Sequence, residues 1–236
     1  EVEPNQAGWS FGRCVAPAGD LNNDGFGDWL VGATGYDNGQ TNEGAVYVYL
    51  GSAGALATTP VAILESNTAS TLFGHAAATA GDVNGDGFAD IVVGAYIYSN
   101  GQSQEGRVYL YLGNAGGVTT TPAWGFESDQ VAANLGFSVC TAGDVNGDGL
   151  SDVIVGAYRY DGTVADDGRI FIFHGNATVG LSLGVSFQVG LGSSGAGFGY
   201  AVSTAGDLNG DGYADIVVGA RTYAAGQAGE GAYKVM

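Results

Sequence analysis

The stretch Asp82-Val-Asn-Gly-Asp-Gly-Phe-Ala-Asp90 decides the fold of this chain, because four near-identical copies of it occur along the sequence. Successive copies have their first aspartates 62, 62 and 63 residues apart, at Asp20, Asp82, Asp144 and Asp207. A register kept over four copies indicates a repeat architecture, in which each repeat is one supersecondary unit. The repeats cover approximately residues 11–66, 73–128, 135–190 and 198–236, and residues 1–10 are assigned to the end of a preceding or of the last repeat.

Each repeat has the apolar pattern of short strands. A Gly-Ala pair lies twelve residues after the first aspartate, and an acidic-Gly pair begins twenty-three residues after it. The runs between these marks are rich in β-branched and aromatic residues and have strand length. In the second repeat they predict strands over residues 73–80, 90–96 and 107–112, and a fourth near 122–127. Four antiparallel strands per repeat form a β-propeller blade, so the sequence predicts an all-β fold and a single propeller domain over residues 1–236.

The composition fits a globular protein with many tight turns. Hydrophobic residues make up 45% of the chain and charged residues 13%, and there are 44 Gly but only 4 Pro. The net charge of −18 excludes nucleic acid and anionic lipid surfaces as favourable partners, because both carry negative charge. No apolar run is long enough to insert into a membrane.

Each copy of the aspartate stretch is a candidate calcium loop. Oxygen ligands at alternate positions of a tight loop, with a Gly after the third, suit a hard cation of calcium size. The predicted ligands are the side chains at loop positions one, three, five and nine and the main-chain carbonyl at position seven. These residues are Asp20, Asn22, Asp24, Phe26 and Asp28; Asp82, Asn84, Asp86, Phe88 and Asp90; Asp144, Asn146, Asp148, Leu150 and Asp152; and Asp207, Asn209, Asp211, Tyr213 and Asp215.

The alternative is that these residues only form turns, in which Asp, Asn and Gly are common. The loops hold twelve of the 24 acidic residues, and three carboxylates in one loop would repel one another without a cation. Four Ca²⁺ would change the net charge from −18 to −10. The sequence therefore predicts about four structural calcium ions. Loops of this kind suit the millimolar calcium outside cells, which favours an extracellular or cell-surface, secreted protein.

These motifs resemble the FG-GAP repeats of the integrin α-subunit head and of bacterial integrin-like proteins. The resemblance rests on the calcium loops, on Phe-Gly pairs at residues 11–12, 73–74 and 198–199, and on Gly-Ala pairs where the family has Gly-Ala-Pro. The third repeat departs from the pattern with Leu135-Gly136, and none of the repeats has the Pro.

The resemblance implies that calcium loops occupy one side of the propeller. It implies that the loops joining strands four to one and two to three form the opposite side, which binds the ligand. That side would include Trp9, Tyr36, Tyr98, Tyr160 and Tyr223. Packing between blades is an alternative role for these tyrosines. Trp29 aligns with Ile91, Val153 and Ile216, so a core position is predicted for it.

The sequence favours a binding protein over an enzyme. Its two histidines, His75 and His174, form no metal-ligand spacing and are expected to be structural. The first interpretation is a calcium-stabilised adhesion or recognition module for a protein or glycan. The alternatives are a lectin-like or accessory propeller of a carbohydrate-active enzyme, and a purely structural spacer.

Two questions stay open at the level of sequence. Residues Val2 and Glu3 could add a closing strand to a four-bladed ring, or the four repeats could belong to a propeller of about seven blades within a longer chain of further blades or domains; the longer propeller is favoured. Cys14 and Cys140 occupy near-equivalent places in different repeats, and we expect both to be unpaired.

Overall fold

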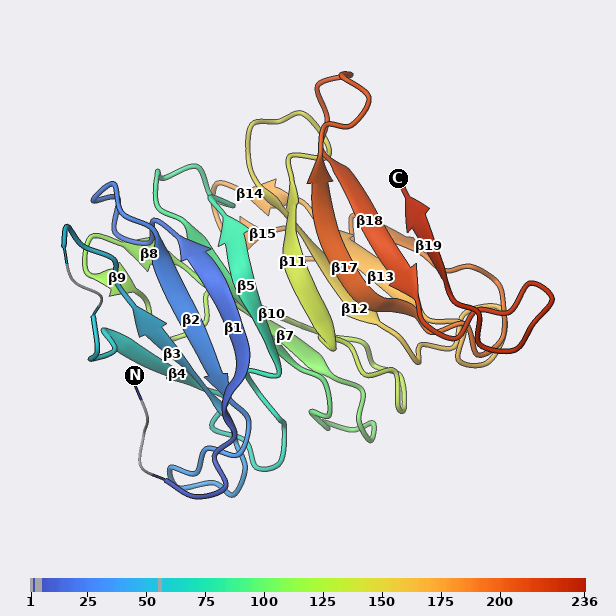
Figure 1. The fold of residues 1–236 in the computed structure, drawn as a ribbon, viewed down its shortest axis with the longest axis horizontal. Coiled ribbons are helices and arrows are strands. Elements are labelled where there is room, and N and C mark those ends of the chain that lie inside the picture. The colour runs from blue at the N-terminus through green and yellow to red at the C-terminus, as the bar shows by residue number, and fades with distance from the viewer. Residues whose placement is uncertain (1, 3–5, 55–56) are drawn as a thin grey trace.

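The computed structural model describes residue 2 and residues 6–54 and 57–236, which form strands, turns and bends without a helix. Glu3, which with Val2 could add a closing strand, is outside the described residues. Figure 1 shows the sheets side by side in a fan, with the first repeat at one end and the fourth at the other. Within the described chain there is accordingly no helix that could cross a membrane.

Each repeat forms one antiparallel sheet, and this confirms the predicted propeller blades. The first blade contains β1 (Phe11–Gly19), β2 (Asp28–Ala33), β3 (Ala45–Tyr49) and β4 (Ala62–Glu65). The second contains β5 (Ala76–Gly81), β6 (Asp90–Ala95), β7 (Arg107–Tyr111) and β10 (Trp124–Glu127). The third contains β11 (Ser138–Gly143), β12 (Asp152–Ala157), β13 (Arg169–Phe173) and β16 (Phe187–Val189). The fourth contains β17 (Phe198–Gly206), β18 (Asp215–Ala220) and β19 (Ala232–Val235).

The strand boundaries agree with the predicted ones except at the start of the second blade. The first strand was predicted from residue 73, but β5 begins at Ala76. Phe73 instead forms a parallel bridge to Gly44 of the first blade. Two short hairpins between the third and fourth strands were not predicted. They are β8 (Gly113–Asn114) with β9 (Gly117–Val118), and β14 (Gly175–Asn176) with β15 (Gly180–Leu181).

Three apolar cores lie between successive blades. Side chains alternate between the two faces of a strand, so a strand buried on both faces is apolar throughout. In β6, Ile91 and Val93 point toward the first blade, where they meet Val46 and Leu64. Val92 points the other way, into the core shared with the third blade. The third core joins the third blade to the fourth.

At each interface between blades, a pair of glycines sets how closely the two blades approach. A Cβ built on Gly94 of β6 would lie 1.9 Å from the carbonyl oxygen of Gly136, which belongs to the next blade. The equivalent distances are 2.1 Å from Gly32 to Gly74 and 2.0 Å from Gly156 to Gly199. The Gly of each Gly-Ala pair thus packs on the Gly of the next Phe-Gly or Leu-Gly pair. Leu135 replaces Phe in that pair and is as fully buried as Phe73 and Phe198.

The outer face of the first blade is only partly covered. Val15 of β1 is 73% exposed, whereas Ala77 and Val139 at the same place in the next two blades are 5% and 8% exposed. Trp29, predicted to be in the core, is only partly buried and stacks on Tyr49 with ring centroids 5.5 Å apart. Its equivalents are buried because another sheet packs on that face. Val2 lies on this same face, beside Phe11 and Trp29.

The cysteines are both free, as predicted. The Sγ of Cys14 donates a hydrogen bond to the carbonyl of Ala77 in the next blade at 3.5 Å. Burial raises the pKa of the Cys14 thiol, so it remains protonated at neutral pH.

The glycine contact yields a matched pair of variants. Gly94→Ala should lower the free energy of unfolding by about 1–3 kcal/mol, because the added methyl group overlaps the backbone of Gly136 and the blades must separate. Gly219→Ala is the control, since a Cβ there would have its nearest neighbour at 3.7 Å. Denaturant unfolding of both variants measures the difference. Equal stability would contradict the role given to the glycine contact.

Candidate metal centres

The four aspartate loops lie at the same end of the fan, at the top in Figure 1. Each loop joins the first strand of its blade to the second, for example β5 to β6. The strands hold the two ends of each loop, and the glycines inside it allow the tight reversal. The sequence repeat therefore becomes a row of four similar acidic loops.

The aspartate at position one folds the loop around its own carboxylate. In the second loop, Oδ1 of Asp82 accepts the amides of Gly85 and Asp86, and Oδ2 accepts the amide of Gly87. The same bonds form around Asp144 and Asp207. Backbone amides favour the ionised carboxylate, so the pKa of Asp207 is lowered by the amide of Gly212 and its neighbours.

In the first three loops the aspartate at position nine is buried and connects the loop to the rest of the blade. In Asp90, Oδ2 accepts the amide of Val83 at 2.9 Å and Oδ1 accepts the amide of Gly113 at 2.9 Å. Asp28 and Asp152 repeat both bonds. Burial raises the pKa of Asp90 to about 7, although these amides act against it. Removing this carboxylate from water is therefore costly, and a nearby cation would favour its charged form.

Positions three and five supply the remaining side-chain oxygens. The amide Nδ2 of Asn22 donates to Oδ2 of Asp24 at 2.9 Å, and Asn84, Asn146 and Asn209 repeat this contact. In the first loop, Oδ1 of Asn22 is buried without a hydrogen-bond partner among the described residues. Oxygens that lack a donor are suited to a cation. The residues present thus fit a hard cation.

The three carboxylates of one loop lie farther apart than the ligands around a bound cation do. Among the described residues, no three aspartate side chains of one loop bring carboxylate oxygens within 4.8 Å of one another. Each carboxylate already accepts backbone amides, but its oxygens together offer about four lone-pair sites, so acceptor capacity remains. A cation would bind through these sites. The position-seven residue sits at the turn, where the amide of Phe88 donates to Oδ1 of Asp86; its carbonyl stays a predicted ligand.

Neighbouring loops are joined by main-chain hydrogen bonds. The carbonyl of Asp20 accepts the amide of Ala89 at 2.9 Å, and Ala89 is position eight of the next loop. The carbonyls of Asp82 and Asp144 accept the amides of Ser151 and Ala214 in the same way. Position one of each loop therefore touches the loop of the following blade.

The residues predicted for the ligand side lie at the opposite end, but they differ in burial. Tyr36 and Tyr98 are each 8% exposed, and their hydroxyls bond to Glu65 and Arg107. Trp9 is partly exposed and packs on Tyr36 with ring centroids 4.5 Å apart. Tyr160 and Tyr223 are also partly buried. Tyr36 and Tyr98 are thus members of apolar cores, and ligand contact by the five residues stays a prediction.

A group of rings whose contacts with one another were not predicted from the sequence lies at this end of the fan. We call it the channel cluster: His75, Tyr96, Phe137, Tyr158 and Tyr200. Phe137 is at its centre, with ring centroids 4.9 Å from His75, 4.5 Å from Tyr158 and 4.8 Å from Tyr200.

Two arginines border the channel cluster. Arg13 Nη2 lies 3.3 Å from His75 Nε2, and Arg221 donates to the hydroxyl of Tyr200 at 2.9 Å. Burial, and then the charge of Arg13, lowers the pKa of His75 to about 4, so His75 is neutral at pH 7. The sequence did carry a signal for this cluster. The residue after each Phe-Gly or Leu-Gly pair is large in all four repeats: Arg13, His75, Phe137 and Tyr200.

The blades, their glycine contacts and the acidic loops define the class of protein: a β-propeller built from repeats with an acidic loop between the first two strands. The FG-GAP repeat family matches residues 11–49, 73–111, 135–173 and 198–233. The chain belongs to the FG-GAP repeat family, as the resemblance predicted.

Several integrin α subunits are similar to this chain. Integrin alpha-5 of Xenopus laevis is 37% identical over 183 residues, which are 73% of this chain and 17% of that protein. Integrin alpha-3 of Mus musculus is 35% identical over 161 residues, 66% of this chain and 15% of that protein. Integrin alpha-7 of Homo sapiens is 34% identical over 191 residues, 75% of this chain and 14% of that protein. The chain thus spans about a sixth of the length of these relatives.

Positions five and nine of one loop should respond differently to mutation. In the presence of a chelator, Asp90→Ala should lower the free energy of unfolding by about 2 kcal/mol or more, because the buried amides of Val83 and Gly113 lose their acceptor. Asp86→Ala should cost less than about 1 kcal/mol there, because Asp86 is exposed. Chemical denaturation in chelator tests this, and equal losses would refute the division of roles.

Proposed function

We propose that this chain is a calcium-stabilised extracellular module for binding or adhesion. One observation carries the proposal: the two ends of the fan differ chemically. Acidic loops of nearly constant sequence occupy one end, and aromatic side chains with variable loops occupy the other. A constant end suits a structural role, whereas a variable end on a rigid scaffold suits recognition.

The structural role is best explained by calcium. Positions one, three, five and nine of each loop place oxygen atoms around a tight turn, and oxygen ligands select hard cations. The unpartnered Oδ1 of Asn22 and the raised pKa of Asp90 both describe groups that a cation would satisfy. Calcium binding at such loops is suited to the millimolar levels found outside cells, which supports a cell-surface or secreted location.

Calcium binding is tested by counting ions and by melting. The chain should bind about four Ca²⁺ at the aspartate loops, and each site should add about 2.7 kcal/mol of stability when calcium is a hundredfold above its dissociation constant. Asp86→Ala should remove one ion and leave the other loops filled, since repeats interact mainly with their neighbours. Calorimetry with calcium and thermal melting in chelator give both readouts. A chain that takes up no calcium at the loops would rule the structural role out.

The recognition role is assigned to the end opposite the aspartate loops. The loops between the second and third strands differ in every repeat: Asp-Asn-Gly-Gln-Thr at 37–41, Ser-Asn-Gly-Gln-Ser at 99–103, Asp-Gly-Thr-Val-Ala at 161–165 and Ala-Ala-Gly-Gln-Ala at 224–228. Between them, the channel cluster offers partly exposed rings and two flanking arginines. Aromatic rings and arginine are the side chains most enriched at energetically important protein contacts.

A protein ligand is the first candidate, and the similarity to integrin α subunits supports it. A glycan is the second, because aromatic rings with polar tips also pack on sugars. In that case the chain would serve as a lectin-like or accessory propeller of a carbohydrate-active enzyme. A panel of immobilised glycans and of extracellular matrix proteins separates the two, and a chain that binds neither but assembles end to end would favour a structural spacer.

Mutation of the aromatic end should separate binding from stability. Trp9→Ala and Tyr158→Ala should each weaken the ligand found in that panel by about 1 kcal/mol or more, because partly exposed aromatic side chains dominate such contacts. Calcium-dependent melting should be nearly unchanged. Asp211→Ala, at the far end, is the control and should leave ligand affinity intact. If only the control variant loses affinity, the ligand binds on the calcium side.

A further inference from the structure

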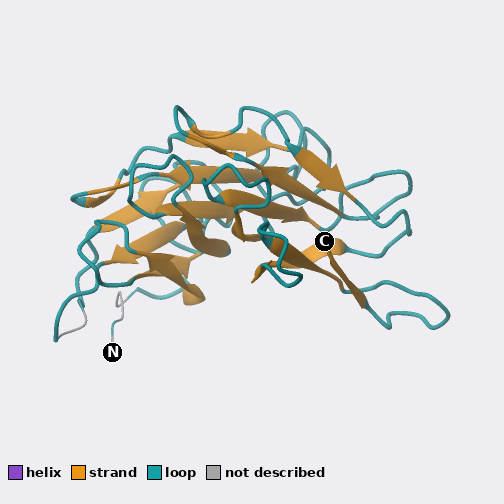
Figure 2. Cartoon of the chain, turned by 90° about the horizontal axis from the view of Figure 1, so that it is seen from above, coloured by secondary structure: helices purple, strands orange, loops and turns teal. Residues whose placement is uncertain are grey.

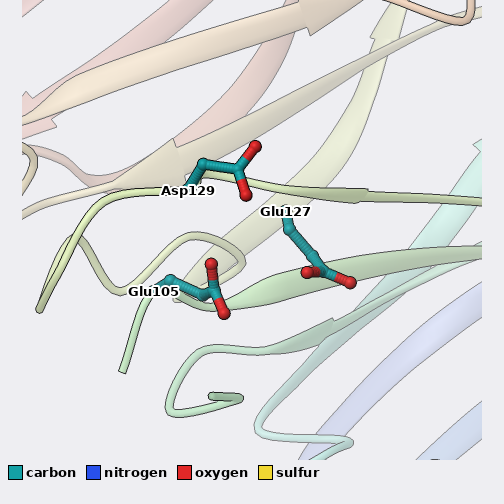
Figure 3. Close-up of side chains that lie close together, drawn as sticks. All are labelled: Glu105, Glu127 and Asp129. Carbon is teal, nitrogen blue, oxygen red and sulfur yellow. The ribbon is translucent and has the colours of Figure 1, made fainter. Parts of the chain in front are cut away.

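Three carboxylates gather at the end of the second blade that faces away from the aspartate loops. They belong to Glu105, just before β7, to Glu127, the last residue of β10, and to Asp129, in the loop to the third blade. One carboxylate oxygen from each lies within 4.8 Å of the others. Figure 3 shows the Glu105 carboxylate pointing into the space between Glu127 and Asp129.

The hydrogen bonds of this cluster leave one buried oxygen unsatisfied. Oε1 of Glu105 accepts the amide of Asn100 at 2.5 Å, but Oε2 has no partner among the described residues, although Glu105 is 0% exposed. Glu127 is better satisfied, by Arg107 at 3.0 Å and by the side-chain amide of Asn100 at 3.0 Å. A buried acceptor without a donor is energetically costly, and more so when it is charged. The free oxygen of Glu105 therefore needs a partner, which can be a cation, a water molecule or a proton.

The residues equivalent to Glu105 in the other repeats show when a carboxylate oxygen at this position lacks a partner. In the third repeat, Asp167 accepts the amides of Gly192 and Ser193. In the fourth, Glu230 accepts the amides of Ala225 and Gln227. Within the described chain, a buried carboxylate oxygen at this position is unpartnered only in Glu105 and in Glu43 of the first repeat. Those are the two repeats whose fourth strand ends in a second glutamate, Glu127 and Glu65.

The charge of the cluster identifies the class of ligand. Three carboxylates and the guanidinium of Arg107 leave two negative charges, which one divalent cation would neutralise. Carboxylate-only donor sets select hard cations such as Ca²⁺, Mg²⁺ or Mn²⁺ over zinc or copper. We propose that Glu105, Glu127 and Asp129 bind a hard divalent cation of the calcium class, separate from the aspartate loops. Asp129 is exposed, so water completes the coordination from the solvent side.

The site is tested with Mn²⁺ as the probe. Crystals of the chain containing Mn²⁺ should show an anomalous difference peak between the three carboxylates, in addition to any peaks at the aspartate loops. In solution, Asp129→Asn should weaken one class of Mn²⁺ site by about tenfold or more, because carboxylate number sets affinity at such sites. Asn is suited to the φ of +53° at residue 129, so this variant keeps its backbone. Glu105→Gln should act on the same site.

Asp37→Asn is the matched control, since it removes one exposed charge at the same end of the fan without touching the cluster. It should leave every Mn²⁺ site unchanged. Asp86→Ala tests cation binding at the aspartate loops separately. A finding that these loops bind no cation would therefore not affect the test of the Glu105 cluster. No peak beside Glu105 at saturating Mn²⁺, or equal Mn²⁺ binding by the chain and by Asp129→Asn, would overturn the proposal and leave water or a proton as the partner of Oε2.

Discussion

The contact between backbone glycines of successive blades is the constraint on which the rest of the structure depends. At Gly32, Gly94 and Gly156 the second strand approaches the next blade so closely that a Cβ would overlap a carbonyl oxygen. This distance fixes how the sheets stack, and β-branched and aromatic side chains then fill the cores between them. The same contact places the Phe-Gly or Leu-Gly pair of each following blade against the blade before it. Phe73, Leu135 and Phe198 are therefore fully buried. Glycine and the residue before it therefore act together as the joint between blades.

With the blades fixed in this way, each end of the fan acquires its own chemistry. The loops from first to second strands all emerge at one end, and their carboxylates are arranged by amides of the same loop. The starts of the first strands converge at the other end, where His75, Phe137 and Tyr200 meet although they are distant in sequence. The acidic triad of the second blade lies at this end too. The two ends can therefore diverge in sequence independently while the glycine joints stay the same.

Much of the fold could be predicted because the sequence of a single repeat determines where its strands lie. Strand positions such as residues 90–96 and 107–112 follow from period and composition, and the structure confirms β6 and β7 there. What failed depends on neighbours that a single repeat does not reveal. Trp29 aligns with buried residues but lies on a face without a covering sheet. The burial of Tyr36 and Tyr98 agrees with the alternative role in packing. The unpartnered oxygen of Glu105 was also beyond the sequence, because it depends on which amides fold back to the carboxylate.

The hydrogen bonds between adjacent loops have a mechanical consequence. Each pair of blades is held at one end by a glycine joint and at the other by an amide-to-carbonyl bond such as that from Ala89 to Asp20. Sliding one blade past the next would have to break both attachments at once, since the sheets between them are stiff. A force directed across the fan is therefore opposed at each interface by two attachments rather than by one. An ion that tightens a loop would stiffen the connection to the next blade, which is useful in a protein exposed to tension.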